Sequence, residues 1–315
     1  MREKRILFTG MAIILFVSIG FGCNDLLTDA NQDNSTLTPG ELIYRDLQGT
    51  WSHDGKMIAY YSFGDSVKQS GLYIIDSTGE QIHFFNSAMQ LPSWSNDDSK
   101  IAFTFMPSNQ IYTIEVASRV LKQVTFSGRN YFPTWSIEDD YILHDCRDNS
   151  FAPFYHLRKT SIETGVFQVL LSLPDSGDIR SPHYYDDFSK VIYSRHGSYE
   201  GSSEVFIMDT LGNELKRLTR RSGFEYAPIM SPDNKMVLFT NAPTMNSNIV
   251  TAACILNLET NSLFELTEYN SEACDWSPDG QGILIADMRI DKGNLVVIDL
   301  AGNVLKEVTK PLKKL

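Results

Sequence analysis

The sequence predicts an all-β protein whose main body is a six-bladed β-propeller of four-stranded antiparallel blades. A short phrase, with a leading Trp, a Ser-x-Asp turn and an apolar strand, recurs six times along the chain with some variation. A second phrase follows it, in which an apolar strand ends in an acidic residue shortly before a turn residue. Successive copies of the first phrase are 43, 41, 49, 46 and 46 residues apart. A period in the forties, built only from strand-length runs and turn residues, is typical of propeller blades.

The first phrase predicts a tight turn between two strands. Ser, Asp and Asn side chains bond their own backbone and Gly tolerates positive φ, so the run Trp-Ser-Pro-Asp-Gly reverses the chain. The strand that follows alternates apolar and polar residues before the second phrase begins. The six copies begin at Trp51, Trp94, Trp135, Tyr184, Met230 and Trp276.

Each repeat supplies four strands. The second phrase is the third strand, and its Asp-x-x-Gly end, as in Leu295–Gly302, is a hairpin turn into an outer strand. Blade three carries a degraded version around Leu157–Gly165. A blade cannot bury both faces alone, so the blades must stack around an axis and close. The last blade has its own outer strand, so we expect closure by packing, with Glu41–Leu47 supplying the first blade's inner strand.

Residues 1–22 have the parts of a secretory signal. Three basic residues precede an apolar run over residues 6–21, which is shorter than the roughly 20 residues that a spanning helix needs. The small residues before Cys23 resemble the bacterial lipoprotein box, with Gly20 in place of the usual Leu, Val or Ile. This resemblance implies cleavage before Cys23 and its acylation, and several acyl chains anchor a protein more firmly than one. The alternative is an ordinary signal peptide with an incidental Cys23.

Residues 23–41 are polar and poor in aromatics, which predicts a flexible tether. The expected organisation is therefore a lipoprotein signal peptide at 1–22, the lipidated Cys23 with its tether at 23–41, and the propeller at 42–315. We expect the mature protein at a bacterial cell envelope, lipid-anchored to a membrane and either periplasmic or surface-exposed. The sequence does not assign the membrane.

The chain is acidic, with a net charge of −12, and removal of residues 1–22, which carry +2, leaves −14. This balance argues against a nucleic-acid partner and against electrostatic adhesion to anionic lipid. Three cysteines remain beyond Cys23. Cys254 and Cys274 lie in neighbouring repeats and can pair in an oxidising compartment, whereas Cys146 is alone. We interpret all three as buried free thiols, with the Cys254–Cys274 disulfide as the alternative.

The repeats resemble the TolB-type propeller repeat. The resemblance is clearest in Asp275–Ala286 and Pro92–Phe103, and it covers about residues 45–310. It implies the architecture but not the function, because this repeat occurs in TolB, in prolyl oligopeptidases, in oligogalacturonate lyase and in many lipoproteins. TolB carries an α/β domain before its propeller, which the short stretch between Cys23 and the first blade does not provide, so we expect a protein other than TolB. Gly197–Gly201 lacks the Gly-x-Ser-x-Gly order of a prolyl oligopeptidase elbow.

The candidate binding residues are expected at one end of the propeller. If both kinds of turn lie at one end, the loops before each leading Trp and after each second strand lie at the other. Charged and aromatic side chains around an axial channel can bind a peptide, a glycan or a partner's loop. The candidates in these loops are Arg129, Tyr131, Arg147, Arg180, His183, Arg195, His196, Tyr226, Glu272, Asp287 and Arg289.

The alternative function is a polysaccharide lyase or hydrolase with its site at the channel mouth. That chemistry needs His or carboxylate ligands that converge on the axis to hold a metal, and a basic residue to take a proton. His144, His183 and His196 flank inner strands and are near enough in the repeats to approach one another. No close-spaced metal motif accompanies them, so we interpret them as scattered polar residues and expect no metal or other cofactor. The favoured function is non-catalytic: a binding or scaffold protein for an envelope protein or glycan.

Overall fold

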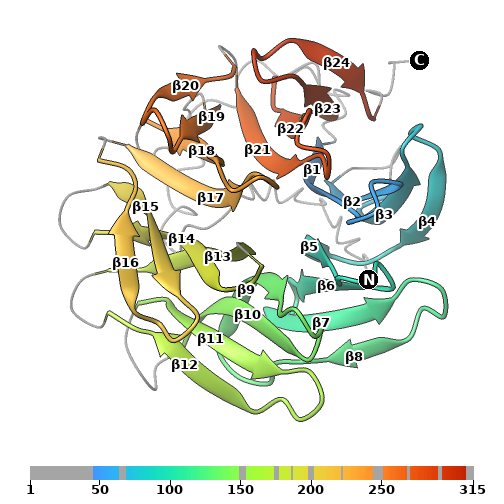
Figure 1. The fold of residues 1–315 in the computed structure, drawn as a ribbon. Helices are drawn as coiled ribbons and strands as arrows, with labels where there is room; N and C mark the ends of the chain where they lie inside the picture. Colours follow the sequence, from blue (N-terminus) through green and yellow to red (C-terminus); the bar gives the residue numbers. More distant parts are fainter. Residues whose placement is uncertain are drawn as a thin grey trace, which may run out of the picture. The chain divides into compact units, whose positions relative to one another are not determined.

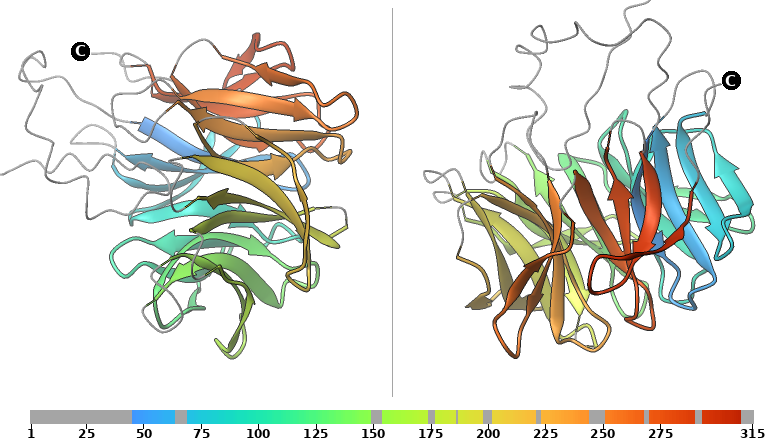
Figure 2. Two further views of the ribbon diagram at one scale, coloured as in Figure 1. Left: turned by 90° about the vertical axis from the view of Figure 1, so that its left-hand side faces the viewer. Right: turned by 90° about the horizontal axis from the view of Figure 1, so that it is seen from above.

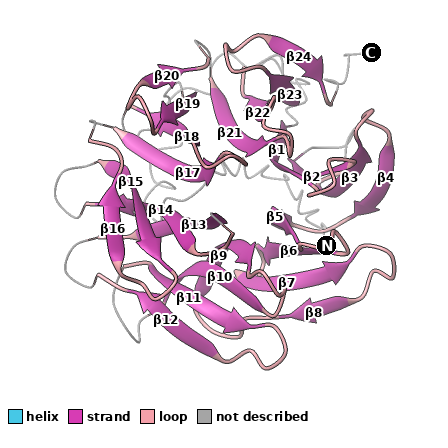
Figure 3. Cartoon of the chain, viewed as in Figure 1, coloured by secondary structure: helices cyan, strands magenta, loops and turns pink. Residues whose placement is uncertain are grey.

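The computed structural model describes residues 45–63, 69–148, 154–173, 177–185, 187–197, 202–220, 223–243, 251–267, 270–289 and 293–309. The predicted signal peptide and tether lie outside these residues. The described residues form strands and turns and no helix (Figure 3), so none of them belongs to a helix long and apolar enough to cross a membrane. Their strands make six four-stranded antiparallel blades in a ring (Figure 1), and a parallel contact between Ser203 and Phe224 joins blades four and five into one sheet. The predicted six-bladed propeller is confirmed.

Each blade is a meander of four strands that succeed one another outward from the axis. The inner strands are β1 (Arg45–Trp51), β5 (Met89–Trp94), β9 (Arg129–Trp135), β13 (Ile179–Tyr185), β17 (Phe224–Met230) and β21 (Ser271–Trp276). The second strands are β2 (Met57–Phe63), β6 (Lys100–Phe105), β10 (Tyr141–Arg147), β14 (Lys190–His196), β18 (Met236–Ala242) and β22 (Ile283–Asp287). The third strands are β3 (Gly71–Asp76), β7 (Gln110–Glu115), β11 (His156–Ser161), β15 (Ser203–Asp209), β19 (Ala252–Asn257) and β23 (Asn294–Ile298). The outer strands are β4 (Gln81–Phe85), β8 (Leu121–Gln123), β12 (Phe167–Leu171), β16 (Glu214–Arg217), β20 (Leu263–Glu265) and β24 (Val304–Glu307).

The recurring Ser builds the predicted turn between the first two strands. In blade one the Met57 N–H donates to Ser52 Oγ at 2.9 Å, and the Ser52 hydroxyl donates to Asp54 at 2.8 Å. Blade six repeats both contacts around Ser277, at 2.8 Å and 2.6 Å. The last turn residue has positive φ in every blade, which Gly, Asp and Asn tolerate best. These residues are Gly55, Asp98, Asp139, Phe188, Asn234 and Gly280, and in blade four, where the residue is Phe, the preceding Asp187 also has positive φ.

A β-bulge interrupts each inner strand, two to three residues before the leading Trp or its equivalent. The strand pairing shifts there in all six blades. Pro follows the bulged residue in four blades, as expected where no ladder hydrogen bond is donated. The bulge turns a backbone N–H toward the preceding blade, as when Leu91 N–H donates to Gln48 Oε1 at 2.8 Å. The bulged residues with positive φ are Gln48, Leu91, Phe132, Ser181 and Ala227.

The apolar core is divided into six layers, one between each pair of neighbouring blades. The layer between blades three and four contains Leu143 and Tyr193, and the layer between blades six and one contains Tyr60 and Leu284. Each blade therefore buries both faces against its neighbours, and removal of this apolar surface from water stabilises the ring. Because the layers run all the way round, the propeller is closed.

The repeated Trp links blades two, three and six to the blade before them. Its indole packs in the layer between the two blades, where three of the four are only 3% exposed. Its N–H also reaches the main chain of the preceding inner strand, so one side chain supplies both apolar contact and a hydrogen bond. Trp94, Trp135 and Trp276 donate to the carbonyls of Thr50, Ser93 and Ile229 at 3.2, 2.9 and 3.3 Å.

The contact between the last and first blades is different. Trp51 is only partly buried, and its indole N–H has no partner among the described residues. Instead, Asp275 Oδ2 accepts hydrogen bonds from the Trp51 N–H at 2.8 Å and the Thr50 hydroxyl at 3.0 Å. The Asp46 N–H donates to Gly293 O at 2.8 Å. Since β1 belongs to the first sheet and β24 to the last, the expectation of closure by packing is confirmed, with these hydrogen bonds added.

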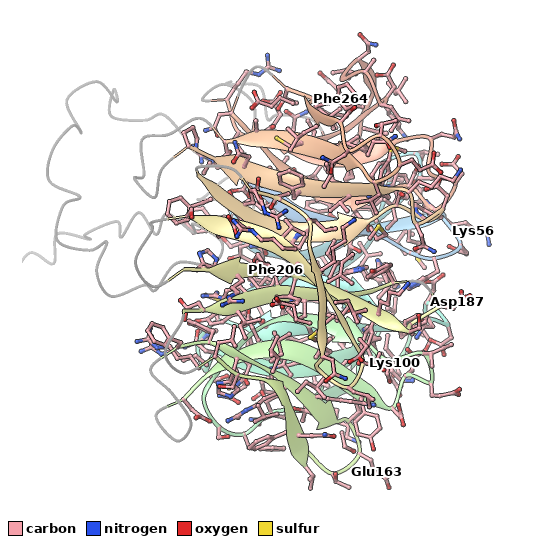
Figure 4. All side chains as sticks on the ribbon, turned by 60° about the vertical axis from the view of Figure 1, so that its left-hand side comes forward. Lys56, Lys100, Glu163, Asp187, Phe206 and Phe264 are labelled. Atoms are coloured by element: carbon pink, nitrogen blue, oxygen red, sulfur yellow. The ribbon has the colours of Figure 1, made fainter. Side chains whose placement is uncertain are left out.

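The expected division of the ring into two ends is also present. The strands run between the two ends (Figure 2), and their antiparallel order places both kinds of turn at one end. Lys56, Lys100 and Asp187, which lie in or beside the first turns of three blades, are on the same side in Figure 4. We call this end the turn face. The loop face is the opposite end, which carries the second-to-third and outer-to-inner connections.

No disulfide joins the three described cysteines. Cys254 packs in the layer between blades four and five, whereas Cys274 packs against the layer between blades six and one. Cys254 and Cys274 therefore lie in different packing layers and do not pair. Cys146 and Cys254 are buried free thiols.

The Trp contacts predict unequal costs of truncation. Trp94→Ala and Trp135→Ala should each lower the free energy of unfolding by about 3–5 kcal/mol, because both remove a buried indole from a blade-blade layer. Trp51→Ala should cost less, since that side chain is partly exposed and its N–H is unpartnered within the described residues. Urea unfolding monitored by circular dichroism measures all three, and an equal loss for Trp51 would contradict this ranking.

Candidate functional site

The candidate residues from blades three and four meet at the loop face. Arg129 begins β9 and Arg147 ends β10, and the two are direct cross-strand partners. Tyr131 lies two residues into the same inner strand, and Arg180 lies near the start of the next one, β13. Together with Asp145 and Tyr155, which the sequence did not single out, these side chains form what we call the arginine cluster: Arg129, Tyr131, Asp145, Arg147, Tyr155 and Arg180.

A buried ion pair holds the centre of the arginine cluster. Arg180 Nε lies 3.0 Å from Asp145 Oδ2, and both side chains are almost fully buried. The N–H of the bulged Ser181 donates to the same oxygen at 3.1 Å. Burial raises the pKa of Asp145 to about 6, although the Arg180 charge opposes the shift. The carboxyl is thus mainly ionised at neutral pH, and its second oxygen, Oδ1, has no partner among the described residues.

Two tyrosines enclose the Arg180 guanidinium. Its Cζ lies 3.7 Å from the centroid of the Tyr155 ring and 5.7 Å from that of Tyr131. Tyr155 is fixed by its backbone N–H, which donates to Asp178 at 2.7 Å, and Tyr131 by its hydroxyl, which donates to Asn109 at 2.9 Å. A guanidinium over an aromatic face is attracted by the ring quadrupole, so Arg180 is held in one orientation.

Arg129 and Arg147 are exposed at the edge of the arginine cluster. Arg147 Cζ lies 5.9 Å from the Tyr155 centroid, so one ring has two guanidinium groups near it. No ion pair links either exposed arginine to a carboxylate of the described residues. These two side chains therefore present donors that an external anion can reach.

Tyr226 and Glu272 form a second buried group at the loop face, between blades five, six and one. Burial raises the pKa of Glu272 to about 7, and the positive charge of Arg45 and a hydrogen bond from Tyr226 partly oppose this shift. Both side chains are at most 7% exposed. This group lies inside the wall of the ring, and the arginine cluster is the more accessible of the two.

The remaining candidates are engaged elsewhere. Arg195 points outward, where Nη1 lies 3.2 Å from Glu214 of the outer strand β16. Asp287 and Arg289 pair with each other within blade six. His196 stacks on Phe224 of the next blade, with ring centroids 6.1 Å apart. None of these side chains is part of the arginine cluster, although His196 lies near enough for the positive charge of Arg180 to add to the effect of burial in lowering its pKa.

The three histidines considered for a metal centre do not converge. His144 is buried in β10, where Nε2 lies 2.8 Å from Thr160 Oγ1 and Nδ1 lies 3.1 Å from the Asp145 carbonyl. His183 lies near the turn end of β13, away from the loop face, and it is electrostatically coupled to His53 in the blade-one turn. Burial lowers the pKa of His183 to about 4 and that of His196 to about 3, so both are neutral at pH 7.

Cys146, Asp148 and His156 form a group that sequence reasoning missed, with potential ligand atoms within 4.8 Å of one another. Arg158 lies among them: Nε donates to His156 Nε2 at 3.0 Å, and the guanidinium pairs with Asp148. Burial also raises the pKa of the Cys146 thiol to about 12. A divalent cation would have to displace a fixed positive charge and deprotonate a buried thiol, so these residues fit a metal poorly.

Comparison of the repeats identifies what is particular to blade three. Each second strand has one residue opposite the position four before the leading Trp or its equivalent, and in blade three this residue is Asp145. The equivalents in the other blades are Tyr61, Thr104, Ser194, Thr240 and Ala286, none of which is acidic. Aligning the six repeats at this position is the signal that would have found Asp145.

No family model matches the chain. It is 21% identical over 237 residues to the Tol-Pal system protein TolB of Francisella tularensis subsp. holarctica, which covers 73% of this chain and 51% of that protein. The crystal structure of TolB from Acinetobacter baumannii superposes with a TM-score of 0.59 at 18% identity, over 83% of this chain and 62% of the other. The crystal structure of oligogalacturonate lyase from Vibrio parahaemolyticus superposes with a TM-score of 0.56 at 14% identity, over 87% of this chain and 80% of the other.

These likenesses agree with the architecture. The chain is a TolB-like six-bladed β-propeller, and an identity of 21% is compatible with a protein other than TolB. It spans about half the length of the curated relatives that it matches. At these identities the likeness establishes the fold alone. TolB and oligogalacturonate lyase both have this fold, so it does not distinguish between their functions.

The buried ion pair predicts a contrast between single and double substitution. Arg180→Leu should lower the free energy of unfolding by about 3–5 kcal/mol, because it leaves the Asp145 carboxylate buried without its counter-ion. The double variant Asp145→Ala/Arg180→Leu installs the residues found between blades six and one, Ala286 and Leu47. It should recover most of the loss, since apolar pairs often replace buried ion pairs without penalty. Urea unfolding of the three proteins tests this, and a double variant no more stable than the single one would contradict it.

Proposed function

We propose that the protein is a lipid-anchored cell-envelope propeller that binds a partner through its loop face and does not catalyse a reaction. The observation that carries this proposal is the arginine cluster, where buried Arg180 backs two exposed arginines on an otherwise acidic protein. Loops on a rigid scaffold are common binding surfaces. The partner is an envelope protein, and a glycan is the alternative partner.

The envelope location rests on two supports. Residues 1–22 have the composition of a secretory signal followed by Cys23. The curated relatives are components of the Tol-Pal system by name. The proposed anchor places the propeller beside a membrane while the tether separates the lipid from the folded ring.

The anchor is tested by Cys23→Ser. The wild-type chain should partition into detergent and incorporate label from a fatty-acid precursor, and the variant should lose both properties. Its unfolding transition should be unchanged, because Cys23 lies outside the propeller. Label that persists in the variant would exclude acylation at Cys23 and leave an ordinary signal peptide as the alternative.

The binding face is tested by steric blocking within blade three. Ser127 is exposed on the loop face and Ile137 is 54% exposed in the turn at the opposite end. Full-length protein used as bait in detergent-solubilised envelopes should capture a stoichiometric partner. Ser127→Trp should abolish capture and Ile137→Trp should not. Absence of any stoichiometric partner, or loss with Ile137→Trp alone, would contradict the proposal.

A glycan lyase or hydrolase is the second candidate, supported by the fold shared with oligogalacturonate lyase and by basic residues at the loop face. The positions of His144, His183 and His196 weigh against a histidine-bound metal. Incubation of the purified protein with uronic-acid polymers and divalent metals tests this candidate. Release of unsaturated products would favour it over the binding function.

A further inference from the structure

We propose that the arginine cluster is the recognition site for an acidic peptide segment of the partner, an inference that rests on the proposed binding function. The segment would place a carboxylate between the exposed Arg129 and Arg147 and a second one near the terminal nitrogens of Arg180. This assigns a ligand chemistry, clustered Asp or Glu side chains, to one part of the loop face.

Two like charges face each other at the loop end of blade three. Arg129 and Arg147 are directly opposite each other on β9 and β10, and like charges in that arrangement destabilise a sheet. The side chains are exposed, and no carboxylate of the described residues pairs with either. An anion bound between them would offset the repulsion between the two guanidinium groups.

The neighbouring carboxylates already have partners within the protein. Asp145 pairs with Arg180, Asp148 pairs with Arg158, and Asp178 accepts from the backbone of Tyr155. Asp145 and Asp148 are balanced by Arg180 and Arg158, while Asp178 keeps its negative charge near Arg180. In this group the four guanidinium groups of Arg129, Arg147, Arg158 and Arg180 outnumber these three carboxylates. The site therefore keeps positive charge at its surface although the chain as a whole is acidic. Such a local contrast steers an acidic ligand to this face.

The Arg180 side chain is preorganised for binding. Arg180 uses Nε to hold Asp145 and stacks its guanidinium on Tyr155, so little side-chain entropy remains to be lost on binding. Within the described residues the ion pair to Asp145 is its one hydrogen bond, which leaves Nη1 and Nη2 as donors. Guanidinium groups match carboxylates in geometry as well as charge.

An acidic peptide fits this surface better than an acidic glycan. Sugar rings pack on exposed aromatic faces, and the tyrosines of the cluster do not offer one. Tyr155 is 3% exposed and lies under Arg180, and Tyr131 is partly buried near the same guanidinium. What the cluster presents at the surface is charge and hydrogen-bond donors. A flexible chain of Asp or Glu residues supplies the complement without needing an aromatic platform.

The test is binding of a decaglutamate peptide to full-length protein in detergent at low ionic strength. Arg129→Ala/Arg147→Ala should weaken binding at least about tenfold, because it removes both exposed charge-assisted contacts. The matched control is Arg195→Ala/Arg217→Ala, which removes the same charge from arginines that already pair with Glu214 and Glu204. The control should bind within about twofold of wild type. The charge-reversed Arg129→Glu/Arg147→Glu protein should bind decalysine instead.

Stability measurements exclude a folding artefact, because relief of the like-charge pair should leave the melting temperature of Arg129→Ala/Arg147→Ala equal to or above that of wild type. Equal weakening in the control, or no binding of decaglutamate to wild type, would overturn the proposal. Binding of oligogalacturonate of matched charge in its place would overturn it in favour of a glycan. Capture of the envelope partner by Arg129→Ala/Arg147→Ala would refute this site while leaving the proposed function intact.

Discussion

The packing of each blade against its neighbours is the constraint on which the rest of this structure depends. No single four-stranded sheet here has an apolar core of its own, since every core layer is shared by two blades. The ring must therefore close, and the closing contact is chemically distinct. Asp275 supplies side-chain hydrogen bonds to the first inner strand, where blades two, three and six use an indole N–H. Burial raises the pKa of Asp275 to about 6, so neutral pH places a costly charge at this junction.

The same packing determines where specific chemistry can appear. Bulges in the middle of the inner strands direct backbone N–H groups toward the preceding blade, and the acceptor there differs from blade to blade. Between blades one and two it is the Gln48 amide, and between blades five and six it is the Thr240 hydroxyl. Between blades three and four it is the Asp145 carboxylate, which also pairs with the Arg180 guanidinium. A common structural need is thus met by a residue that also positions Arg180 beside two tyrosines.

Much of the fold was predictable because its determinants are local and repeated. The Ser-x-Asp turn, the leading Trp and the hairpin turns identify themselves in sequence, and antiparallel order then separates the two faces. The site was only partly predictable. Arg129, Tyr131, Arg147 and Arg180 were placed on one face and do meet there, but Arg195 points outward to Glu214.

Physical reasons account for the residues that sequence reasoning misplaced. His183 directly precedes Tyr184, the equivalent of the leading Trp, so its place along β13 is near the turn end rather than at the loop face. His156 begins the third strand, β11, just ahead of the degraded repeat of blade three around Leu157–Gly165. Asp145 and Tyr155 owe their roles to contacts between blades, which periodicity within one blade does not reveal.

Hydrogen–deuterium exchange of the full-length protein, alone and with its captured partner, tests the central claim that the loop face of blades three and four is the binding surface. The account predicts slower exchange on binding at the loop ends of β9, β10 and β13, with unchanged exchange in the turns around Ser136 and Ser277. Protection confined to those turns, or spread evenly around the ring, would contradict it.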